Sequence, residues 1–274
     1  VDGLKKRGFE EGKNLVLDRQ NAQADQSNLQ NIGQRFVSNK SDLIYAIATP
    51  AAQTMASLTK DIPIVGSAIT DYVGANLAAS NDAPQGNVTG TSDMSPIREQ
   101  IDLLQKIYPN AKTIGTIYCS SEVNSEVQVK IMREYAESKG LKVETATIST
   151  VNDIQQAAQS LVNKVDVFYE PTDNVISSAL PTLLSVTDPA GKGVVCGEPY
   201  QVRSGALITY GIDYYKLGMQ SGEMAADILE GKAKPATMPI QTAKELRTFV
   251  NKKNAAVLGV AVPEDVMKNA EIIE

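Results

Sequence analysis

Histidine and tryptophan are both absent from this chain of 274 residues. Without histidine there is no Ser-His-Asp or Cys-His nucleophile system and no histidine-ligated metal, and the usual proton shuttle near neutral pH is missing. The missing histidines argue against an enzyme. We therefore expect no catalytic residue, no metal site and no cofactor.

Cysteine and positive charge are also scarce. The two cysteines, Cys119 and Cys196, lack metal-ligand spacing and are too few for a disulfide framework, so we interpret them as buried thiols. The net charge is −6, and no basic block is longer than Lys5-Lys6-Arg7, which gives no sign of a nucleic-acid surface. Neither G-x-G-x-x-G after a strand nor a P-loop occurs, so the phosphate cradle of a nucleotide site is missing.

Long hydrophobic runs and a secretory signal pattern are missing too. The first residues resemble the last turns of a helix that ends at Gly8, where a left-handed cap would lie. We therefore expect that an opening strand, with its ligand contacts, is missing from the N-terminus. Any targeting segment would have been removed with it.

What the chain does have is the material of two globular lobes. It is 42% hydrophobic and 21% charged, and its length suits two units of roughly 100–150 residues each. Apolar runs of strand length alternate with segments of helical period, which is typical of βα units around parallel sheets. The expected strands include 14–19, 42–48, a run ending at Ile69, 113–119, 141–148, 165–169, 193–196 and 206–210.

Helix signals support this alternation. Ser95 is expected to cap a helix with Pro96 at its first position, and Thr150 with Asp153 has capping-box spacing. Asp213 opens a long helix that runs to about Glu230. The turn-rich stretches 83–90 and 231–239 are the expected crossings between lobes.

In open α/β sheets, ligands bind beyond the carboxyl ends of the strands, where helix N-termini present unpaired N–H groups. Nearly every expected strand end supplies a hydroxyl or a carboxylate. Such residues are also ordinary helix N-caps, but six junctions of this kind favour a site. They are Thr49 with Pro50, Thr70 with Asp71, Ser120 with Ser121 and Glu122, the turn 171–174 with Asp173 and Asn174, Glu198 after Gly197, and Asp213 after Gly211.

Hydroxyls and helix-end N–H groups can hold a carboxylate, while a desolvated Asp or Glu can pair with an ammonium group. This combination of donors and acidic groups therefore suits a small zwitterion. A free amino acid has both the carboxylate and the ammonium group that it requires. Tyr169 and Tyr210 are expected to line the pocket and stack on an aromatic or apolar ligand, whereas Tyr45 and Tyr118 are set back and are expected to pack under helices.

Three stretches carry a resemblance to a known family. They are Ser121-Glu122-Val123-Asn124-Ser125, Val165-Asp166 through Pro171-Thr172-Asp173-Asn174, and the run from Gly205 to Tyr215. The chain closely resembles, over essentially its whole length, the substrate-binding proteins of ABC importers that take up tryptophan, tyrosine and phenylalanine. The resemblance implies a type I periplasmic-binding-protein fold, in which two doubly wound parallel-sheet lobes are joined by three crossovers and close on the ligand.

By that pattern the first lobe would be residues 1–88 plus 212–236, and the second 89–211 plus 237–274. Glu122, Asn124 and Ser125 would grip the amino-acid backbone from the second lobe, and Asp173 would pair with the ammonium group. Residues 49–50 and 70–71 would approach from the first lobe. Pro199 replaces a residue that is commonly acidic in the family, which leaves the shape of the loop after Glu198 open.

The resemblance also implies partners and a location. The protein would bind a free amino acid, work with an ABC permease and its ATPase, bind no nucleic acid and act as a monomer. It would lie outside the cytoplasm, in the periplasm or anchored to the membrane as a lipoprotein. The sequence does not rank tyrosine, tryptophan, phenylalanine or a branched-chain ligand.

Two other functions stay open at this point. Cofactor-independent amino-acid racemases also pair two α/β lobes and use one thiol from each side of the substrate, but Cys119 and Cys196 both fall in the expected second lobe. The same fold also serves as the ligand-sensing part of transcription regulators. The upstream sequence would separate a transporter component from a regulator.

Overall fold

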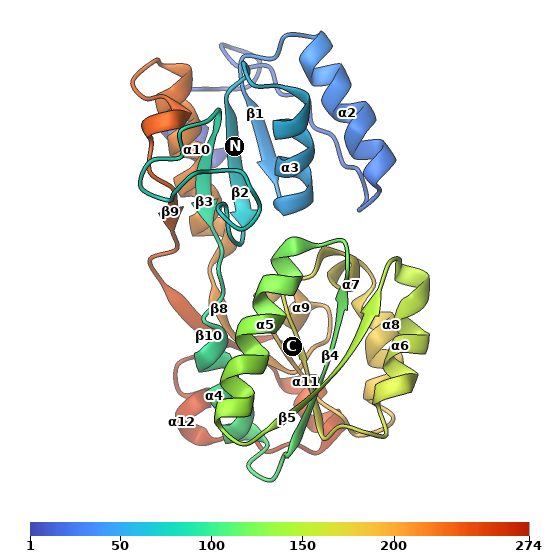
Figure 1. The fold of residues 1–274 in the computed structure, drawn as a ribbon. Helices are drawn as coiled ribbons and strands as arrows, with labels where there is room; N and C mark the ends of the chain where they lie inside the picture. Colours follow the sequence, from blue (N-terminus) through green and yellow to red (C-terminus); the bar gives the residue numbers. More distant parts are fainter. Residues whose placement is uncertain (274) are drawn as a thin grey trace. The chain divides into compact units, whose positions relative to one another are not determined.

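The computed structural model describes residues 1–273, which form two compact α/β units (Figure 1). The first unit contains residues 1–94 and 213–244, and the second contains residues 95–212 and 245–273. Compared with the boundaries expected from the sequence, residues 89–94 and 237–244 belong to the first unit. The reason is that β3 (Val88–Ser92) and β9 (Gln241–Thr242) are strands of its sheet.

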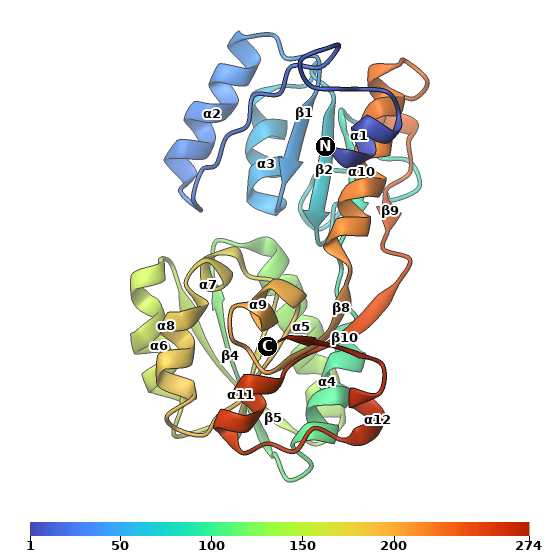
Figure 2. The same ribbon diagram turned by 180° about the vertical axis from the view of Figure 1, so that it is seen from behind.

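The first unit contains a parallel sheet in the order β1-β2-β3-β9. One face is covered by α3 (Thr49–Leu58), which packs on β1 (Ile44–Ile47) and β2 (Ile64–Ile69), and α2 (Gln26–Ser38) packs on α3. The other face is covered by α10 (Tyr214–Leu229), whose Ala225 and Ala226 pack against Val65 of β2 (Figure 2). A short 3₁₀ turn, Pro235–Thr237, precedes β9.

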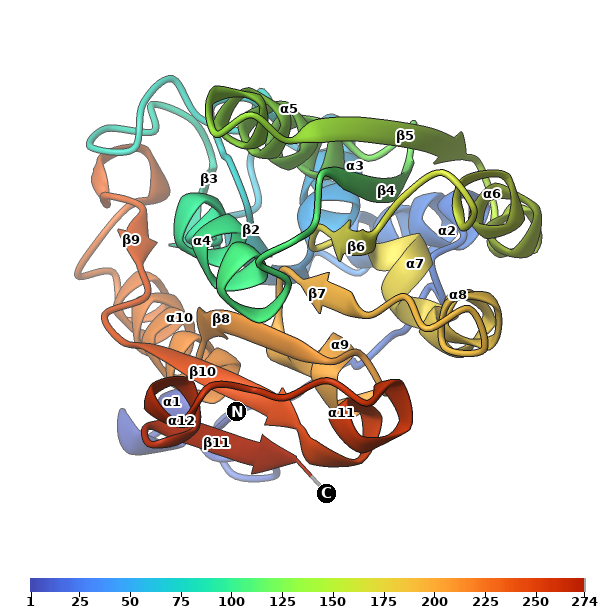
Figure 3. The same cartoon turned by 90° about the horizontal axis from the view of Figure 1, so that it is seen from below.

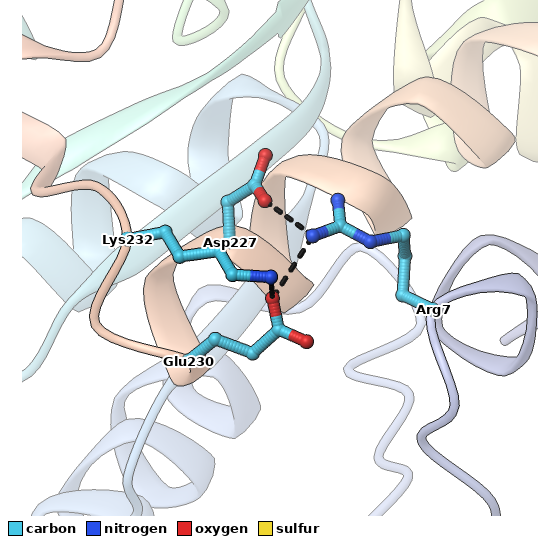
Figure 4. A network of polar contacts seen from close by, with 4 residues as sticks. All are labelled: Arg7, Asp227, Glu230 and Lys232. Carbon is cyan, nitrogen blue, oxygen red and sulfur yellow. Dashed lines mark hydrogen bonds and ion pairs between the residues drawn. The ribbon is translucent and has the colours of Figure 1, made fainter.

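The first helix, α1 (Asp2–Lys6), lies directly on α10. A Cβ atom at Gly3 would lie 2.3 Å from the carbonyl oxygen of Met219, so glycine permits this close approach. Arg7 donates to Asp227 at 2.6 Å and to Glu230 at 2.9 Å, and Lys232 pairs with the same Glu230 oxygen at 2.6 Å (Figure 4). These ion pairs tie the end of α1 to the end of α10.

The second unit contains a mixed sheet in the order β11-β10-β8-β7-β6-β4-β5, in which β10 runs antiparallel to β8 and the other neighbours are parallel (Figure 3). Its strands are β4 (Thr113–Cys119), β5 (Lys142–Ile148), β6 (Val167–Glu170), β7 (Val194–Cys196), β8 (Ile208–Ile212), β10 (Leu246–Asn251) and β11 (Ala270–Ile273).

Helices cover both faces of this sheet, as expected for a doubly wound fold. Two of them, α4 (Ile97–Ile107) and α5 (Val123–Ser138), pack on each other. The opposite face carries the main apolar core of the unit, with Phe168 and Val194 buried under helices. These helices are α6 (Ile154–Leu161), α7 (Asn174–Ser178), α8 (Leu180–Thr187) and α9 (Pro199–Arg203); α11 (Lys252–Leu258) and α12 (Glu264–Met267) lie near the end of the chain.

Most local expectations are confirmed. Gly8 has a φ of +86°, and Thr150 and Asp153 form a capping box at the 3₁₀ turn Val151–Asp153. Two expectations are wrong. Residues 14–19 are not a strand: they pair with no strand of the sheet, and Leu15 forms only an isolated bridge to Glu11; Val16 is 94% exposed. Ser95 caps no helix, because its hydroxyl donates instead to the carbonyl oxygen of Gly197 at 2.9 Å.

Within residues 1–273, none of the helices combines the length and the apolar character that crossing a bilayer requires.

Candidate functional site

In the second unit, the end of β4 and the start of α5 bring five predicted residues together. Ser120 and Ser121 are exposed at the end of the strand, while Glu122, Asn124 and Ser125 are buried at the first turn of α5. Because the carboxyl ends of parallel strands lie at one edge of a sheet, this group adjoins the turn 171–174 after β6.

Glu122 joins the two segments. Its carboxylate accepts hydrogen bonds from the backbone N–H of Asn174 at 3.0 Å, from the side-chain amide of Asn174 at 2.7 Å and from the backbone N–H of Val175 at 3.2 Å. Asn124 donates both to Glu122 at 3.1 Å and to the carbonyl oxygen of Thr172 at 3.0 Å. The predicted Glu-x-Asn-Ser motif therefore holds the start of α7 against the start of α5.

Asp173 is expected from the sequence to pair with a ligand ammonium group, and the structure gives it another role. Its side chain is fully buried and caps α7, accepting from the N–H of Ile176 at 2.9 Å and from the N–H of Cys119 at 2.7 Å. These hydrogen bonds fix the turn 171–174 to the end of β4. Direct contact of Asp173 with a ligand ammonium group stays a prediction.

Other predicted carboxylates are helix caps as well. Glu198 accepts from the N–H groups of Tyr200 at 2.5 Å and Gln201 at 2.9 Å, and thereby caps α9. Asp213 accepts from the N–H of Tyr215 at 3.1 Å and caps α10. Direct ligand contact by Glu198 or Asp213 stays a prediction.

The carboxyl edge of the second unit is rich in buried acids. Burial raises the pKa of Glu122 and that of Asp173, and repulsion by Asp173 raises the pKa of Glu122 further, while hydrogen-bond donors oppose both shifts. Glu170, which is fully buried at the end of β6, has a pKa well above its usual value, again chiefly because of burial.

Three groups at this edge have unused hydrogen-bonding capacity. The backbone N–H groups of Val123 and Asn124 open the sixteen-residue helix α5 and make no hydrogen bond within residues 1–273, so they can donate to an anion. The Oδ1 atom of Asn124 is buried and has no donor among the same described residues. One end of α5 thus offers donors for a carboxylate beside an acceptor for an ammonium group.

In the first unit, the predicted residues also follow strand ends. Thr49 is buried and, with half-buried Pro50, begins α3 directly after β1. Ala48, between strand and helix, has φ +74° and ψ 152°, a region that is costly for any residue except glycine. Such strain is commonly found where a backbone is held for function.

The other first-unit residues form a small polar group. Thr70, after β2, donates to the carboxylate of Asp93 at 3.3 Å, and Tyr214 donates to its other oxygen at 2.6 Å. Burial raises the pKa of Asp93, while these two hydroxyls oppose that shift. Asp71 accepts from the N–H groups of Val73 and Gly74, each at 3.0 Å, and closes a turn.

The prediction for Tyr169 is wrong. Its side chain is fully buried, and its hydroxyl donates to Gln100 of α4 at 2.7 Å, because residue 169 of β6 faces α4 and lies within the core. Tyr210 is half-buried in β8, and its role in a pocket stays a prediction.

The two cysteines are free and fully buried, as expected. Both lie in the second unit, and burial raises the pKa of Cys196 well above its usual value. A racemase needs an ionisable thiol on each side of its substrate, so this arrangement does not favour that function.

Sequence reasoning missed four buried polar residues that organise the site. Gln128 donates to Thr172 and Gln201 donates to the carbonyl oxygen of Pro171 at 2.8 Å, so two amides clamp the turn 171–174. Gln100 lies on the same helical stripe as Ile97 and Leu104, and a polar residue on an apolar stripe was the available signal. Asp93 follows β3 as the other candidates follow their strands, but it lies just past the expected linker.

Within residues 1–273, no group of three or more carboxylate or thiol residues gathers in a way that could hold a metal ion.

Comparison with known proteins places these features in a family. The tyrosine-binding protein of Clostridioides difficile (strain R20291) is 43% identical over 258 residues, which are 94% of this chain and 74% of that protein. The crystal structure of an ABC domain in complex with L-Trp from Streptococcus pneumoniae is 40% identical and has a TM-score of 0.95, covering 100% of this chain and 92% of that one.

A more distant structure shows the fold alone. The periplasmic binding protein/LacI transcriptional regulator from Alkaliphilus metalliredigens QYMF is 14% identical, with a TM-score of 0.58 over 89% of this chain and 90% of that one. The family model for ABC transporter substrate binding proteins matches residues 1–273. The chain therefore belongs to the substrate-binding proteins of ABC transporters.

Proposed function

We propose that this protein captures a free aromatic amino acid, tyrosine, tryptophan or phenylalanine, and delivers it to an ABC permease. As a member of its family it works outside the cytoplasm, with a small-molecule ligand and a membrane permease as partners. The proposal extends to a monomer, either free in the periplasm or anchored as a lipoprotein, that closes its two units on the ligand.

One observation carries the choice of ligand. Two relatives at 43% and 40% identity are a tyrosine-binding protein and a protein in complex with L-Trp. At this identity, over nearly the whole chain, the polar residues that hold the common backbone of an amino acid are expected to be retained.

The geometry at α5 supports an amino-acid backbone as the common element. The free N–H groups of Val123 and Asn124 suit the ligand carboxylate, since a helix N-terminus favours negative charge. The unpaired Oδ1 of Asn124 suits the ammonium group, next to the buried carboxylate of Glu122. Thr49, Pro50, Thr70, Asp71, Ser120, Ser121, Ser125, Asn174, Glu198, Tyr210 and Asp213 remain the proposed surrounding residues.

The absence of tryptophan from the chain makes the test direct. L-tryptophan can be titrated and followed by its own indole fluorescence, excited at the red edge of tyrosine absorption, with no indole background from the protein. L-tyrosine, L-phenylalanine, L-leucine and L-valine are then measured by calorimetry. Saturable binding of an aromatic amino acid is expected, and a protein that binds none of the five would contradict the proposal.

A matched pair of variants tests the role of Asn124. Asn124→Ala should weaken binding at least about tenfold, since it removes a hydrogen bond to a charged group. Asn254→Ala is the control, because Asn254 is a buried asparagine of the same unit that also has an unpaired Oδ1 within the described residues. Equal losses of affinity in both variants would show that Asn124 acts only through folding.

A further inference from the structure

Two of the three places where the chain passes between units are bounded by hydrogen bonds on both sides. The first crossing follows Met94, and the second follows Ile212. On the first-unit side, Asp93 and Tyr214 are joined by the 2.6 Å hydrogen bond from the tyrosine hydroxyl. Asp93 is the residue before Met94, where segment 1–94 of the first unit ends, and Tyr214 is the second residue of segment 213–244. The hydrogen bond therefore links the two segments of the first unit beside their crossings.

On the second-unit side, Gln100 makes the equivalent connection. Its amide donates to the carbonyl oxygen of Tyr210 at 2.8 Å and to that of Gly197 at 3.1 Å. Ser95, the first residue after the crossing, donates to the same Gly197 oxygen at 2.9 Å. The segment after the first crossing is thereby fixed to the segment before the second.

These bonds leave little chain free to rotate. Met94 alone separates Asp93 from Ser95, and Gly211, Ile212 and Asp213 separate Tyr210 from Tyr214. Asp93 is 3% exposed, so its hydrogen bonds are shielded from water and are stronger than surface ones.

We propose that the Asp93–Tyr214 hydrogen bond is a hinge staple, which couples the first two crossings and limits the range of open conformations. The proposal rests on the function proposed above and adds a regulatory residue pair that need not touch the ligand. A protein that spends less time in widely open states loses less conformational freedom on closing and binds its ligand more tightly.

The test compares two neighbouring tyrosines. Tyr214→Phe removes the hydroxyl of the staple, while Tyr215→Phe removes an exposed hydroxyl that donates to Asp2 at 2.9 Å. Spin labels on Gln34→Cys and Val257→Cys, one in each unit, report the distribution of distances, and the buried native cysteines stay unlabelled. L-tryptophan affinity is measured on the same proteins.

We expect Tyr214→Phe to broaden the ligand-free distance distribution and to weaken L-tryptophan binding about fivefold. Tyr215→Phe should match the parent protein in both. A folded Tyr214→Phe protein with an unchanged distribution and unchanged affinity would overturn the staple. If the parent protein binds no amino acid, the proposed function fails, but the ligand-free distributions still decide the staple.

Asp93→Asn separates a hinge role from ligand contact. Asparagine keeps an oxygen that can accept from Tyr214, so the distribution should stay narrow and the affinity should change by less than about threefold. Loss of binding in Asp93→Asn, with binding retained in Tyr214→Phe, would show that the carboxylate contacts the ligand and would overturn the staple as its role.

Discussion

The two units differ in where their unfavourable energy is stored. In the first, it is in the backbone: all seven non-glycine residues with positive φ within residues 1–273 belong to it, including Ala48 and Ala68. In the second, it is in single buried polar atoms without a hydrogen-bond partner, such as Oε2 of Glu170, Oδ1 of Asn124 and Oε1 of Gln201, whereas in the described part of the first unit only Oγ1 of Thr91 is such an atom.

This difference follows from how each unit shapes its carboxyl edge. The first unit has a small sheet, and both Thr49 and Thr70 follow residues with positive φ, which are Ala48 directly after β1 and Ala68 at the irregularity in β2. The second holds its turn 171–174 by a network of Glu122, Gln128 and Gln201. Backbone strain is a conformational penalty at single residues, whereas a buried polar network carries the free-energy cost of removing its groups from water. Where the network contains an acid, that cost depends on pH, because it changes with the ionisation of the acid.

The largest loss of stability is expected from adding a Cβ atom at the closest backbone contact of the first unit. Gly90 has φ +147°, and a Cβ atom there would lie 1.9 Å from the carbonyl oxygen of Gly66. Gly90→Ala should reduce the free energy of unfolding by about 3 kcal/mol, because two adjacent strands must separate. Urea denaturation measures it.

The control for Gly90 is Gly86, where a Cβ atom would have no heavy atom within 4 Å and where φ is not positive. Gly86→Ala should leave the denaturation midpoint nearly unchanged. Equal effects of the two substitutions would mean that the close contact between β2 and β3 is not what limits the first unit.

The next change in stability concerns the buried acid of the second unit. Burial raises the pKa of Glu170 well above its usual value, so in the folded protein this carboxyl keeps its proton to a higher pH than in the unfolded chain, where it ionises above about pH 4.3. The unfolded state then binds fewer protons, so stability falls as pH rises, by about 1.4 kcal/mol per pH unit until the folded pKa is reached.

Glu170→Gln should remove this contribution and flatten the fall in stability as the pH rises above about 4.3. Denaturation curves at several pH values, compared with exposed Glu126→Gln, provide the measurement. An unchanged slope in Glu170→Gln would show that Glu170 is already ionised in the folded protein.

The smallest change in stability is expected from replacing Ala48 with a residue that adopts its backbone conformation without strain. Ala48→Gly should stabilise the first unit by about 1 kcal/mol, because glycine adopts φ +74° without a steric penalty. Ala51→Gly, within the first turn of α3, should destabilise it by up to about 1 kcal/mol. Calorimetric unfolding compares them, and destabilisation by both would show that Ala48 is not strained.

Much of the fold could be predicted because its signals are local. The alternation of apolar runs with helical stripes placed most strands and helices between residues 42 and 230, and the Thr150–Asp153 spacing predicted a capping box that the structure contains. The stretch 83–90, predicted as a crossing between units, instead contains the start of β3, and the chain first leaves the first unit after Met94. The segment 14–19 has the composition of a strand, but a strand exists only if a neighbour accepts its hydrogen bonds, which the local pattern cannot tell.

The site could be predicted less completely, for a physical reason. Carboxylates and hydroxyls at strand ends either cap helices or meet ligands, and both roles select the same residue types. Asp173 and Asp213 match the pattern of ligand residues but accept from backbone N–H groups as helix caps. Gln201 acts from a helix far along the chain from the turn that it holds, and no local motif marks it; Gln100 is marked only as a polar residue on an apolar helical stripe.

The sequence by itself determined the α/β class, the two-unit organisation, the burial of both thiols and the edge at which polar residues gather, since these depend on periodicity and composition. Only the tertiary structure decided which of those polar groups are already satisfied. It also joined Asp93 to Tyr214, which are separated by more than a hundred residues. Such hydrogen bonds depend on how strands that are distant in sequence are brought to one edge of a sheet. Local sequence patterns carry no information about which distant residues become neighbours.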